Sequence, residues 1–501
     1  MKSGIAKNTE PMPAGNAPAP VLGCAWAWAI GALVSIHLVV ALTLMANHVQ
    51  RPEIVEGSEA FRMAIFKQYA EGGHNYYPRG DIQHISDGYT PLTSEIFGWT
   101  VRLLGTDVRW VRLVAGLFGF GGMWLTGACV LRLTGSRYFA FVAAALVAGM
   151  QVKWHLDVGS NTLHAVFSIG ALYLLLRDPQ LSWKTVVLAG MALFASFWSK
   201  QLGLAYMVAG TVFVLARDWR KGVALGMGLA VLTLAGIVYY ESRADSQFLY
   251  WVFEMNQNQP IIWPRLWTVL FTEILTRKYA VSVAFIVAGL LAYERSWKGL
   301  FRPELLLLGA AAVAGGFANC KYGSGPSQMW FFYMCLLVVG LSYAYRFFRE
   351  GRLAAPVLGA LVALQSLALV DDPRPFFINS EDVGRYRQIM DILSRSGRSS
   401  YFINRGFLSF LAGQKVWPQA GEDSWNHKVF DQNMLSKERR AFLASDPWDI
   451  VIIDMPLEDN SYALYERLEK AYRPLYEIPP ATRFATTYDL RFKKIVFEKG
   501  K

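Results

Sequence analysis

The chain has 501 residues, of which 53% are hydrophobic, 14% are aromatic and only 17% are charged. A chain of this length could hold several soluble domains, but the composition argues against them and indicates a polytopic membrane protein. In a soluble protein the formal net charge of +11 would suggest nucleic-acid binding. In a membrane protein basic residues mark the cytoplasmic side instead, so no nucleic-acid partner is expected.

Residues 21–46, VLGCAWAWAIGALVSIHLVVALTLMA, form the first apolar run, which contains one histidine and no formal charge. The run exceeds the ~20 residues that a helix needs to cross a bilayer and is longer than the apolar region of a signal peptide. We therefore expect an uncleaved signal anchor. A disordered cytoplasmic tail is expected before it, over residues 1–20.

Further apolar runs follow, several of them short for a full crossing. They span residues 110–131, 138–152, 161–176, 185–198, 202–216, 222–239, 279–293, 304–319, 329–345 and 353–370. Together with the first run they predict a polytopic α-helical membrane domain of about eleven transmembrane helices over residues 21–371.

Basic residues alternate with these runs along the chain. Threading from a cytoplasmic N-terminus predicts inside loops that contain Arg132 and Arg137, Arg177 and Lys184, RDWRKG, ERSWKGLFR and RFFREGR. The positive-inside rule supports this count, because one span more or fewer would invert every later loop. The predicted outside loops are 47–109, WHLDVGSN, SKQ, 240–278 and CKYGSGPSQ. We expect a multi-pass protein of the inner (plasma) membrane.

The composition changes at about residue 372, after which apolar residues occur in short bursts between charges. The patterns DVGRYRQIMDILSRSG, KERRAFLAS and YALYERLEKAY predict helices, and SSYFIN and WDIVIID predict strands. We therefore expect an extracytoplasmic α/β domain over residues 372–501. Asp454 ends a predicted strand, but no glycine-rich turn follows it, so a structural or acceptor-recruiting role is favoured over ligand binding.

The first predicted outer loop begins with three carboxylates, Glu53, Glu56 and Glu59. SEAFRMAIFKQYAEGG predicts an interfacial helix that Ser58 caps, with Glu56 just ahead of its N-terminus, where an anion is favoured. A solvated position is expected for Glu53, Glu59 and Asp81. Glu56 lies beside a glycine near membrane depth, which favours function. For Asp87, also followed by a glycine, both readings stay open.

Polar residues recur at the later outer junctions. Asp157 and Asn161 are four residues apart and would share a helical face, unless the segment is an ordinary turn. Lys200 and Gln201 join two spans on the side where a cation is unexpected, and a lysine there suits a phosphate oxyanion, with a snorkelling lysine as the alternative. The remaining candidate phosphate ligands, with solvated charges as the alternative, are Arg265, Arg277, Lys278 and Lys321.

Metal-ligand spacing is missing from the sequence. His155 and His164 lack a nearby cluster of further ligands, so no metal ligands are predicted, and the sequence leaves open whether a divalent cation assists. The cysteines lie in or beside apolar runs and offer no disulfide framework. They are Cys24, Cys129, Cys320 and Cys335.

Several stretches together resemble the polyprenyl-phosphate-sugar-dependent glycosyltransferases of the GT-C fold, which include protein O-mannosyltransferases and the aminoarabinose transferase of lipid A. They are EIVEGSEAFRMAIFKQYAEGG, YTPLTSEIFGWTVRLLG, RWVRLVAGLFGF, DVGSNTLHAVFSIGALYLLL, SKQLGL and KYGSGPSQMWFF. The resemblance covers nearly the whole chain. It implies that Glu56 takes the position of the catalytic carboxylate and Lys200 that of the lysine facing the donor phosphate. Asp157 stands where the family pattern has arginine, and Gly159 where it has aspartate.

The resemblance implies an inverting glycosyltransferase that moves a hexose or pentose from a polyprenyl-phosphate donor to a hydroxyl of an extracytoplasmic glycan, lipid or protein. Glu56 would be the base, with Asp87 in reserve. The sequence contains no P-loop, no GxGxxG after a strand and no Asp-x-Asp pair, which agrees with a lipid-linked donor. The alternatives are a membrane transporter or lipid-linked sugar flippase, and a sensor or scaffold whose α/β tail is the working part.

Overall fold

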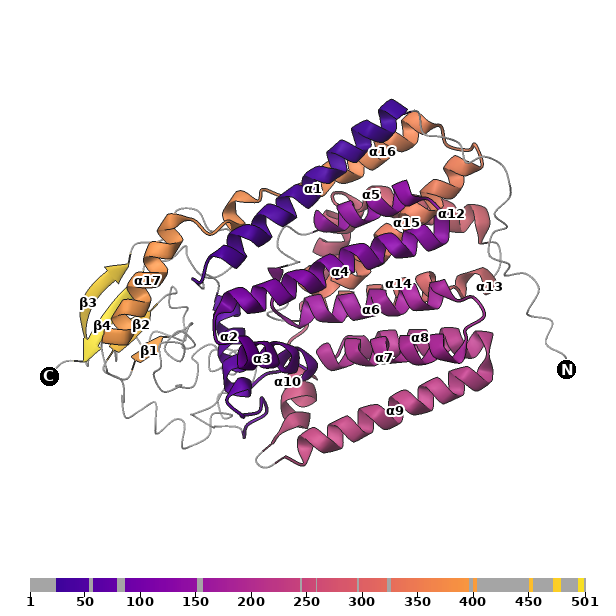
Figure 1. The fold of residues 1–501 in the computed structure, drawn as a ribbon. Helices are drawn as coiled ribbons and strands as arrows, with labels where there is room; N and C mark the ends of the chain where they lie inside the picture. The colour runs from indigo at the N-terminus through magenta and orange to yellow at the C-terminus, as the bar shows by residue number, and fades with distance from the viewer. Residues whose placement is uncertain are drawn as a thin grey trace.

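The computed structural model describes residues 24–53, 57–78, 86–150, 156–243, 246–257, 259–294, 297–321, 326–395, 400–402, 450–453, 472–478 and 494–499. Most of these residues belong to helices that run side by side as a bundle (Figure 1). The tail expected over residues 1–20 lies outside the described residues.

Every apolar run that the sequence singled out is helical. The corresponding helices are α1 (Cys24–Gln50), α4 (Val108–Thr134), α5 (Arg137–Ala148), α6 (Ser160–Arg177), α7 (Trp183–Ser199), α8 (Gly203–Arg217), α9 (Trp219–Glu241), α12 (Ala280–Tyr293), α14 (Pro303–Cys320), α15 (Trp330–Arg349) and α16 (Ala355–Ala368). Among the described residues, five helices, α1, α4, α9, α14 and α15, are long and apolar enough to cross a membrane by length and composition. The protein is therefore a helical multi-pass membrane protein.

Shorter helices lie between the spans and after them. They are α2 (Gly57–Ala70), α3 (Leu92–Leu104), α10 (Met255–Gln257), α11 (Pro264–Thr268), α13 (Trp297–Leu300) and α17 (Ser380–Arg395). Helix α2 confirms the helix predicted in SEAFRMAIFKQYAEGG, but the prediction that Ser58 caps it was wrong, because α2 already begins at Gly57. Gly72, just past its end, adopts a φ of 94°, which favours glycine. Helices α2 and α3 cover one end of the bundle, which we call the site end (Figure 1).

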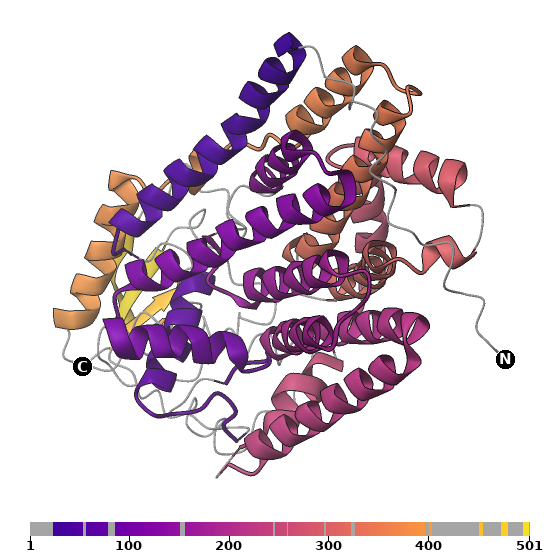
Figure 2. The same ribbon diagram turned by 45° about the vertical axis from the view of Figure 1, so that its right-hand side comes forward.

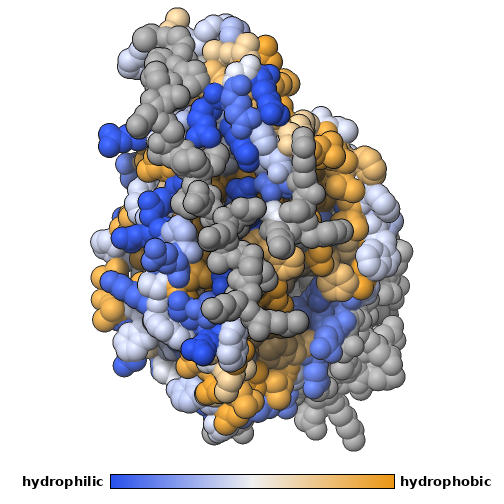
Figure 3. Space-filling model, turned by 90° about the vertical axis from the view of Figure 1, so that its right-hand side faces the viewer, coloured by the Kyte–Doolittle hydropathy of each residue, from blue (hydrophilic) through white to orange (hydrophobic). Residues whose placement is uncertain are grey.

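The opposite end holds the turns between α4 and α5, α6 and α7, and α8 and α9 (Figure 1). Local chemistry fixes these turns: Gly135 ends α4 at a φ of 74°, and the Ser136 and Ser182 hydroxyls and the Asp218 carboxylate cap the helices that follow. Hydrophilic residues gather on this end in Figure 3, among hydrophobic ones. The predicted inside loops between these helices thus lie together, while the side of the membrane they face stays a prediction.

Helix α15 forms the centre of the bundle and packs against α4, α5, α6, α12 and α14. In the 18-residue apolar stretch of α15, 83% of the residues are buried, whereas in that of α9 only 17% are buried. Helix α9 accordingly forms an edge of the molecule in both Figure 1 and Figure 2. Close packing needs small residues: a Cβ on Gly340 of α15 would lie 3.0 Å from Ser282 of α12.

Four short strands follow α17: β1 (Ser400–Phe402), β2 (Ile450–Ile453), β3 (Tyr472–Ile478) and β4 (Lys494–Lys499). They form a sheet in the order β1-β2-β4-β3, in which only β1 and β2 pair in parallel. The predicted helix at DVGRYRQIMDILSRSG and the strands in SSYFIN and WDIVIID are confirmed by α17, β1 and β2.

The predicted helix at KERRAFLAS and Asp454 lie outside the described residues. So does the predicted helix at YALYERLEKAY, apart from its last residue, Tyr472. Tyr472 begins strand β3, so the prediction that it ends a helix was wrong. Strands β3 and β4 were not predicted from the sequence. Because most of residues 403–501 are not described, a single α/β domain over residues 372–501 stays a prediction.

Candidate functional site

Lys200 lies at the site end, in the turn between α7 and α8. Only 4% of the residue is exposed, and its Nζ donates a hydrogen bond to Asn161 Oδ1 of α6. The Tyr89 ring centroid lies 4.9 Å from the same nitrogen. Burial and, after it, the Arg62 charge lower the pKa of Lys200 to about 7, against the opposing effects of Asp157 and Asp87. A buried lysine whose charge depends on its neighbours is typical of a functional site.

Asp157 and Asn161 reach the same site from the start of α6. Asn161 Nδ2 donates to Ser327 Oγ at 3.1 Å, so this side chain links Lys200 to the segment before α15. Asp157 lies ahead of α6 and forms an ion pair with Arg62 of α2. The prediction that helical spacing would align Asp157 with Asn161 was wrong in its reason, because α6 begins only at Ser160.

Asp87 lies in the segment before α3 and is 7% exposed. Its Oδ2 accepts a hydrogen bond from Ser94 Oγ at 3.1 Å, and its Oδ1 accepts one from the Tyr89 amide at 3.2 Å. Burial raises the pKa of Asp87 to about 6, against the opposing effects of these hydrogen bonds and of the Arg62 and Lys200 charges. Asp87 is therefore a buried carboxylate that titrates near neutral pH, as a general base requires.

We expect Asp87→Asn to stabilise the protein more at pH 8 than at pH 4.5. Since the fold raises the carboxyl pKa from 3.8 to about 6, the cost of this carboxyl to folding is zero below pH 3.8, grows between pH 3.8 and about 6, and is complete above about pH 6. Asparagine does not ionise, so the variant avoids this cost to the free energy of folding, which is about 3 kcal/mol above pH 6. Thermal unfolding in detergent at the two pH values measures the difference. Asp107→Asn is the control of opposite sign, because hydrogen bonding to Arg109 lowers the pKa of Asp107; an equal effect of Asp87→Asn at both pH values would contradict the prediction.

Gln201 supports the site rather than projecting its amide nitrogen into it. Gln201 Nε2 donates to the carbonyl of Gly88 at 2.7 Å and to that of Val252 at 2.9 Å. Thr90 Oγ1 similarly donates to the Phe197 carbonyl at 2.8 Å. These bonds fasten the Asp87 segment to the α7–α8 turn that carries Lys200.

Lys321 and Arg265 lie in a second group that connects to the first through Asn256. Arg265 Nη1 donates to the Lys321 carbonyl at 3.0 Å, and Lys321 Nζ donates to the Asn256 carbonyl at 2.7 Å. Asn256 Nδ2 in turn donates to the Gly88 carbonyl at 2.8 Å. Both cations thus engage backbone carbonyls. Lys278 was also a candidate, but its Nζ lies 2.6 Å from Asp371 Oδ2, in an ion pair that Arg277 joins at 3.9 Å.

Glu56, the expected base, lies outside the described residues, but its neighbours are tightly held. The predictions that Glu53 and Glu59 are solvated were wrong, since they are 2% and 8% exposed. Arg112 of α4, which is fully buried, donates to both carboxylate oxygens of Glu59 at 2.7 and 2.6 Å. It also donates to the carbonyl of Glu53 at 2.9 Å and, at 2.8 and 2.6 Å, to those of His48 and Arg51.

Arg112 was missed by the sequence analysis, although it lies inside the apolar run 110–131. An ionisable residue within a membrane span is itself a signal, because such a group needs a buried partner. Glu53 has a further partner: Arg387 of α17 donates to its Oε1 at 2.8 Å. The segment after the membrane domain thus contacts the start of the first loop.

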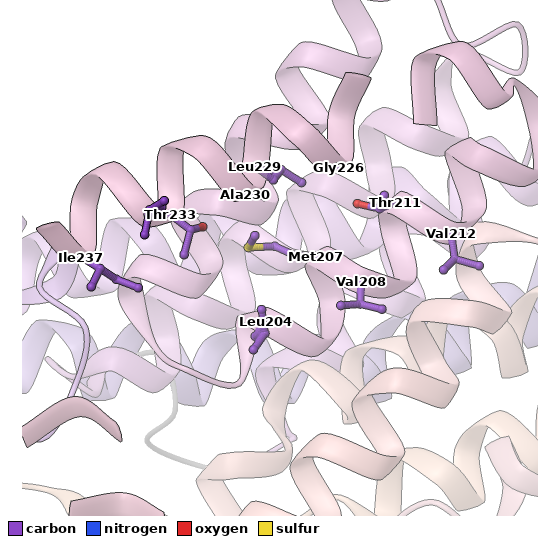
Figure 4. Close-up of a pocket in the computed structure, with 11 residues that line it drawn as sticks. Leu204, Met207, Val208, Thr211, Val212, Gly226, Leu229, Ala230, Thr233 and Ile237 are labelled. Atoms are coloured by element: carbon purple, nitrogen blue, oxygen red, sulfur yellow. The ribbon is translucent and has the colours of Figure 1, made fainter. Parts of the chain in front are cut away.

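A groove of about 500 Å³ lies apart from this polar cluster, between α8 and α9. Its lining is apolar except for Thr211 and Thr233 (Figure 4). Leu204, Val208 and Leu234 in its lining are exposed, so the groove lies on the outer surface of the bundle. Within the described ranges, no group of three or more His, Cys, Asp or Glu residues could hold a metal ion.

The bundle with its polar site end has the fold of the GT-C glycosyltransferases. The chain is similar to the crystal structure of ArnT from Cupriavidus metallidurans bound to undecaprenyl phosphate, with 14% identity and a TM-score of 0.57 over 93% of this chain and 97% of ArnT. It is also similar to the oligosaccharyltransferase AglB from Archaeoglobus fulgidus in complex with an inhibitory peptide and a dolichol-phosphate, with 13% identity and a TM-score of 0.50 over 91% of this chain and 74% of AglB. No protein-family model and no curated protein matches the chain. At these identities the likeness shows the fold alone.

Proposed function

We propose that this protein is a glycosyltransferase that moves a sugar from a polyprenyl-phosphate donor to a hydroxyl group of an extracytoplasmic glycan, lipid or protein. The observation that carries the proposal is the buried Lys200, which lies with Asp87 and the Arg62–Asp157 pair at one end of the GT-C-type bundle. The solved structures of ArnT and AglB hold undecaprenyl phosphate and dolichol-phosphate, which supports a lipid-phosphate ligand here.

The chemistry needs a base for the acceptor hydroxyl and a cation for the departing phosphate. Lys200 would stabilise the negative charge that develops on the lipid phosphate as the sugar leaves. Glu56 would accept the hydroxyl proton, an effect worth ~10²- to 10⁴-fold. Asp87 is the reserve base, since its carboxylate is ionised at pH 7 when its pKa is about 6. A single displacement would invert the anomeric centre.

The side of the membrane on which the site end lies follows from the kind of donor. A lipid-linked sugar carries its own activation, so the reaction needs no nucleotide and suits an extracytoplasmic site end. We therefore place the N-terminus in the cytoplasm and residues 372–501, as an α/β domain, outside. The ion pair between Arg387 and Glu53 supports a role for this C-terminal segment close to the first loop.

The function is tested with full-length protein purified in detergent, a panel of polyprenyl-phosphate sugars and cell-envelope material as the source of acceptor hydroxyls, with release of free polyprenyl phosphate as the readout. We expect release with at least one donor, and a loss of ~10²-fold or more in Glu56→Gln. The donor and acceptor would be named by the glycan and glycolipid profile of a strain that lacks the chain. Normal turnover by Glu56→Gln would remove Glu56 as the base and leave Asp87 to be tested in the same assay.

The same assay separates the enzyme from a transporter or flippase. In detergent there are no compartments, so a transporter can bind a lipid-linked sugar but cannot release its lipid phosphate. Binding of a polyprenyl-phosphate sugar without any release of polyprenyl phosphate, across the whole panel and in the presence of cell-envelope acceptors, would contradict the proposed function.

A further inference from the structure

Arg62 of α2 reaches the site beside Lys200, although the sequence analysis assigned it no function. Its Nη1 donates to Asp157 Oδ1, and the two side chains are 19% and 16% exposed. Its charge acts on Asp87 and on Lys200, so all four ionisable groups belong to one site. Arg62 comes from the first loop, whereas Lys200 comes from the turn between α7 and α8.

Gly159 provides the space for the Arg62 guanidinium group. A Cβ atom at position 159 would overlap the guanidinium carbon and both of its terminal nitrogens. The φ of Gly159 is −110°, which any residue can adopt, so the glycine is required by this close contact rather than by backbone conformation. The guanidinium group is thereby seated against the residue that precedes the first turn of α6.

The first turn of α6 adds further donors to this place. Gly159, the N-cap, supplies no side-chain cap to the 18-residue helix, so the first amides have no side-chain acceptor from that position. The Ser160 hydroxyl is unpaired among the described residues, although Ser160 is only 3% exposed. A buried, unpartnered hydroxyl at a helix N-terminus beside an arginine is suited to an anion with several oxygens.

Arg62 and Lys200 are neighbouring cations, and after burial the Arg62 charge is the largest cause that lowers the pKa of Lys200. Two carboxylates offset these cations: Asp157 pairs with Arg62, and Asp87 also acts on Lys200. Burial raises the pKa of the Asp87 carboxyl to about 6, so this group can take up a proton when an anion binds near it.

We propose that Arg62, seated on Gly159, and the first turn of α6 form the second half of the phosphate site, beside Lys200. The ligand is the phosphate group of the polyprenyl-phosphate donor and product, so this inference rests on the proposed function. Arginine holds phosphate with two parallel N–H donors, and Asp157 orients the guanidinium group for that contact.

The test measures the affinity of full-length protein in detergent for a short-chain polyprenyl phosphate and for the corresponding polyprenyl alcohol. Arg62→Gln is expected to weaken binding of the phosphate by about 10- to 100-fold and to leave binding of the alcohol unchanged. Arg62→Lys should recover only part of the loss, because it keeps the charge without the planar fork. Arg102→Gln, a change of an exposed arginine on α3, is the matched control and should not alter either affinity.

Gly159→Ala gives an independent arm, because the added methyl group displaces the Arg62 guanidinium group without removing its charge. It should weaken binding of the phosphate in the wild-type background and have little further effect in Arg62→Gln, so the two changes are not additive. Only variants whose melting temperature matches that of the wild type are compared. If Arg62→Gln does not fold, the affinities of Arg62→Lys and Gly159→Ala test the inference.

Three outcomes would overturn the inference, and they differ from one another. If Lys200→Met weakens phosphate binding while Arg62→Gln and Gly159→Ala leave it unchanged, the proposed function stands and Arg62 is only structural. If Arg62→Gln weakens binding of the alcohol as much as that of the phosphate, Arg62 shapes the fold rather than the phosphate site. If wild-type protein binds no polyprenyl phosphate, the proposed function fails together with this inference.

Discussion

Replacing Lys200 by methionine is expected to lower kcat/KM for sugar transfer from the polyprenyl-phosphate donor by about 10²- to 10³-fold. Lys200 is 4% exposed and projects its Nζ toward Asn161. Methionine keeps an unbranched apolar stem of similar length, so packing around the α7–α8 turn is retained while the cation is lost. The departing phosphate then lacks a donor that acts when its charge develops, which slows the chemical step rather than only weakening binding.

Lys221→Met is the control for this experiment. Lys221 lies at the opposite end of the bundle, where its Nζ pairs with Asp218 Oδ2 at 3.1 Å, and its loss should leave transfer unchanged.

In the wild type, kcat/KM should fall as the pH rises through about 7, because Lys200 then loses its proton. This decrease of kcat/KM with rising pH should be missing in Lys200→Met. The groups that contact or act electrostatically on the lysine are Arg62, Asp87, Tyr89, Asp157, Asn161 and His164. Wild-type transfer by Lys200→Met would show that Lys200 does not face the phosphate.

Arg112→Met should destabilise the folded protein by about 3 to 5 kcal/mol, because it leaves the buried Glu59 carboxylate without its partner. The same change removes the hydrogen bonds from Arg112 to the carbonyls of His48, Arg51 and Glu53. Those carbonyls lie at the end of α1 and in the segment that follows it, so the first loop loses its attachment to α4. Thermal unfolding in detergent, read as a fall in Tm, measures the loss.

Arg109→Gln is the matched control on the same helix. The Arg109–Asp107 pair is 46% and 28% exposed, and an exposed ion pair contributes about 0–1 kcal/mol. The double change Arg112→Met with Glu59→Met removes both buried charges and should recover part of the stability. If Arg112→Met and Arg109→Gln lower Tm equally, the network around Arg112 does not hold the first loop.

Much of the membrane domain could be predicted from the sequence, because apolar length and loop charge act locally. Each apolar run is a helix, and the α4–α5, α6–α7 and α8–α9 turns, which hold basic residues, gather at one end. The site was predicted in part for the same reason: Lys200 and Asn161 stand out as polar residues at the ends of apolar runs, and the fold brings them into contact.

The rest depended on pairings between distant residues, which composition does not reveal. Glu59 looked solvated because its partner Arg112 lies 53 positions away. Arg62 lies within the predicted interfacial helix and was given no role there, and only the approach of α2 to Gly159 places it in the site. Tyr472 was predicted to end a helix, but pairing with Lys499 makes it the start of a strand.

Helix α1 contacts α16, and His37 Nε2 lies 3.0 Å from Ser366 Oγ, 329 positions later in the chain (Figure 1). The ribosome therefore synthesises α1 long before its partner α16. During synthesis the His37 ring lacks this partner until α16 has been made, and a polar group inside the bundle is costly without a partner. Folding of this bundle is thus completed from its C-terminal side, and a chain that stops before α16 leaves α1 without the contact that holds it in the fold.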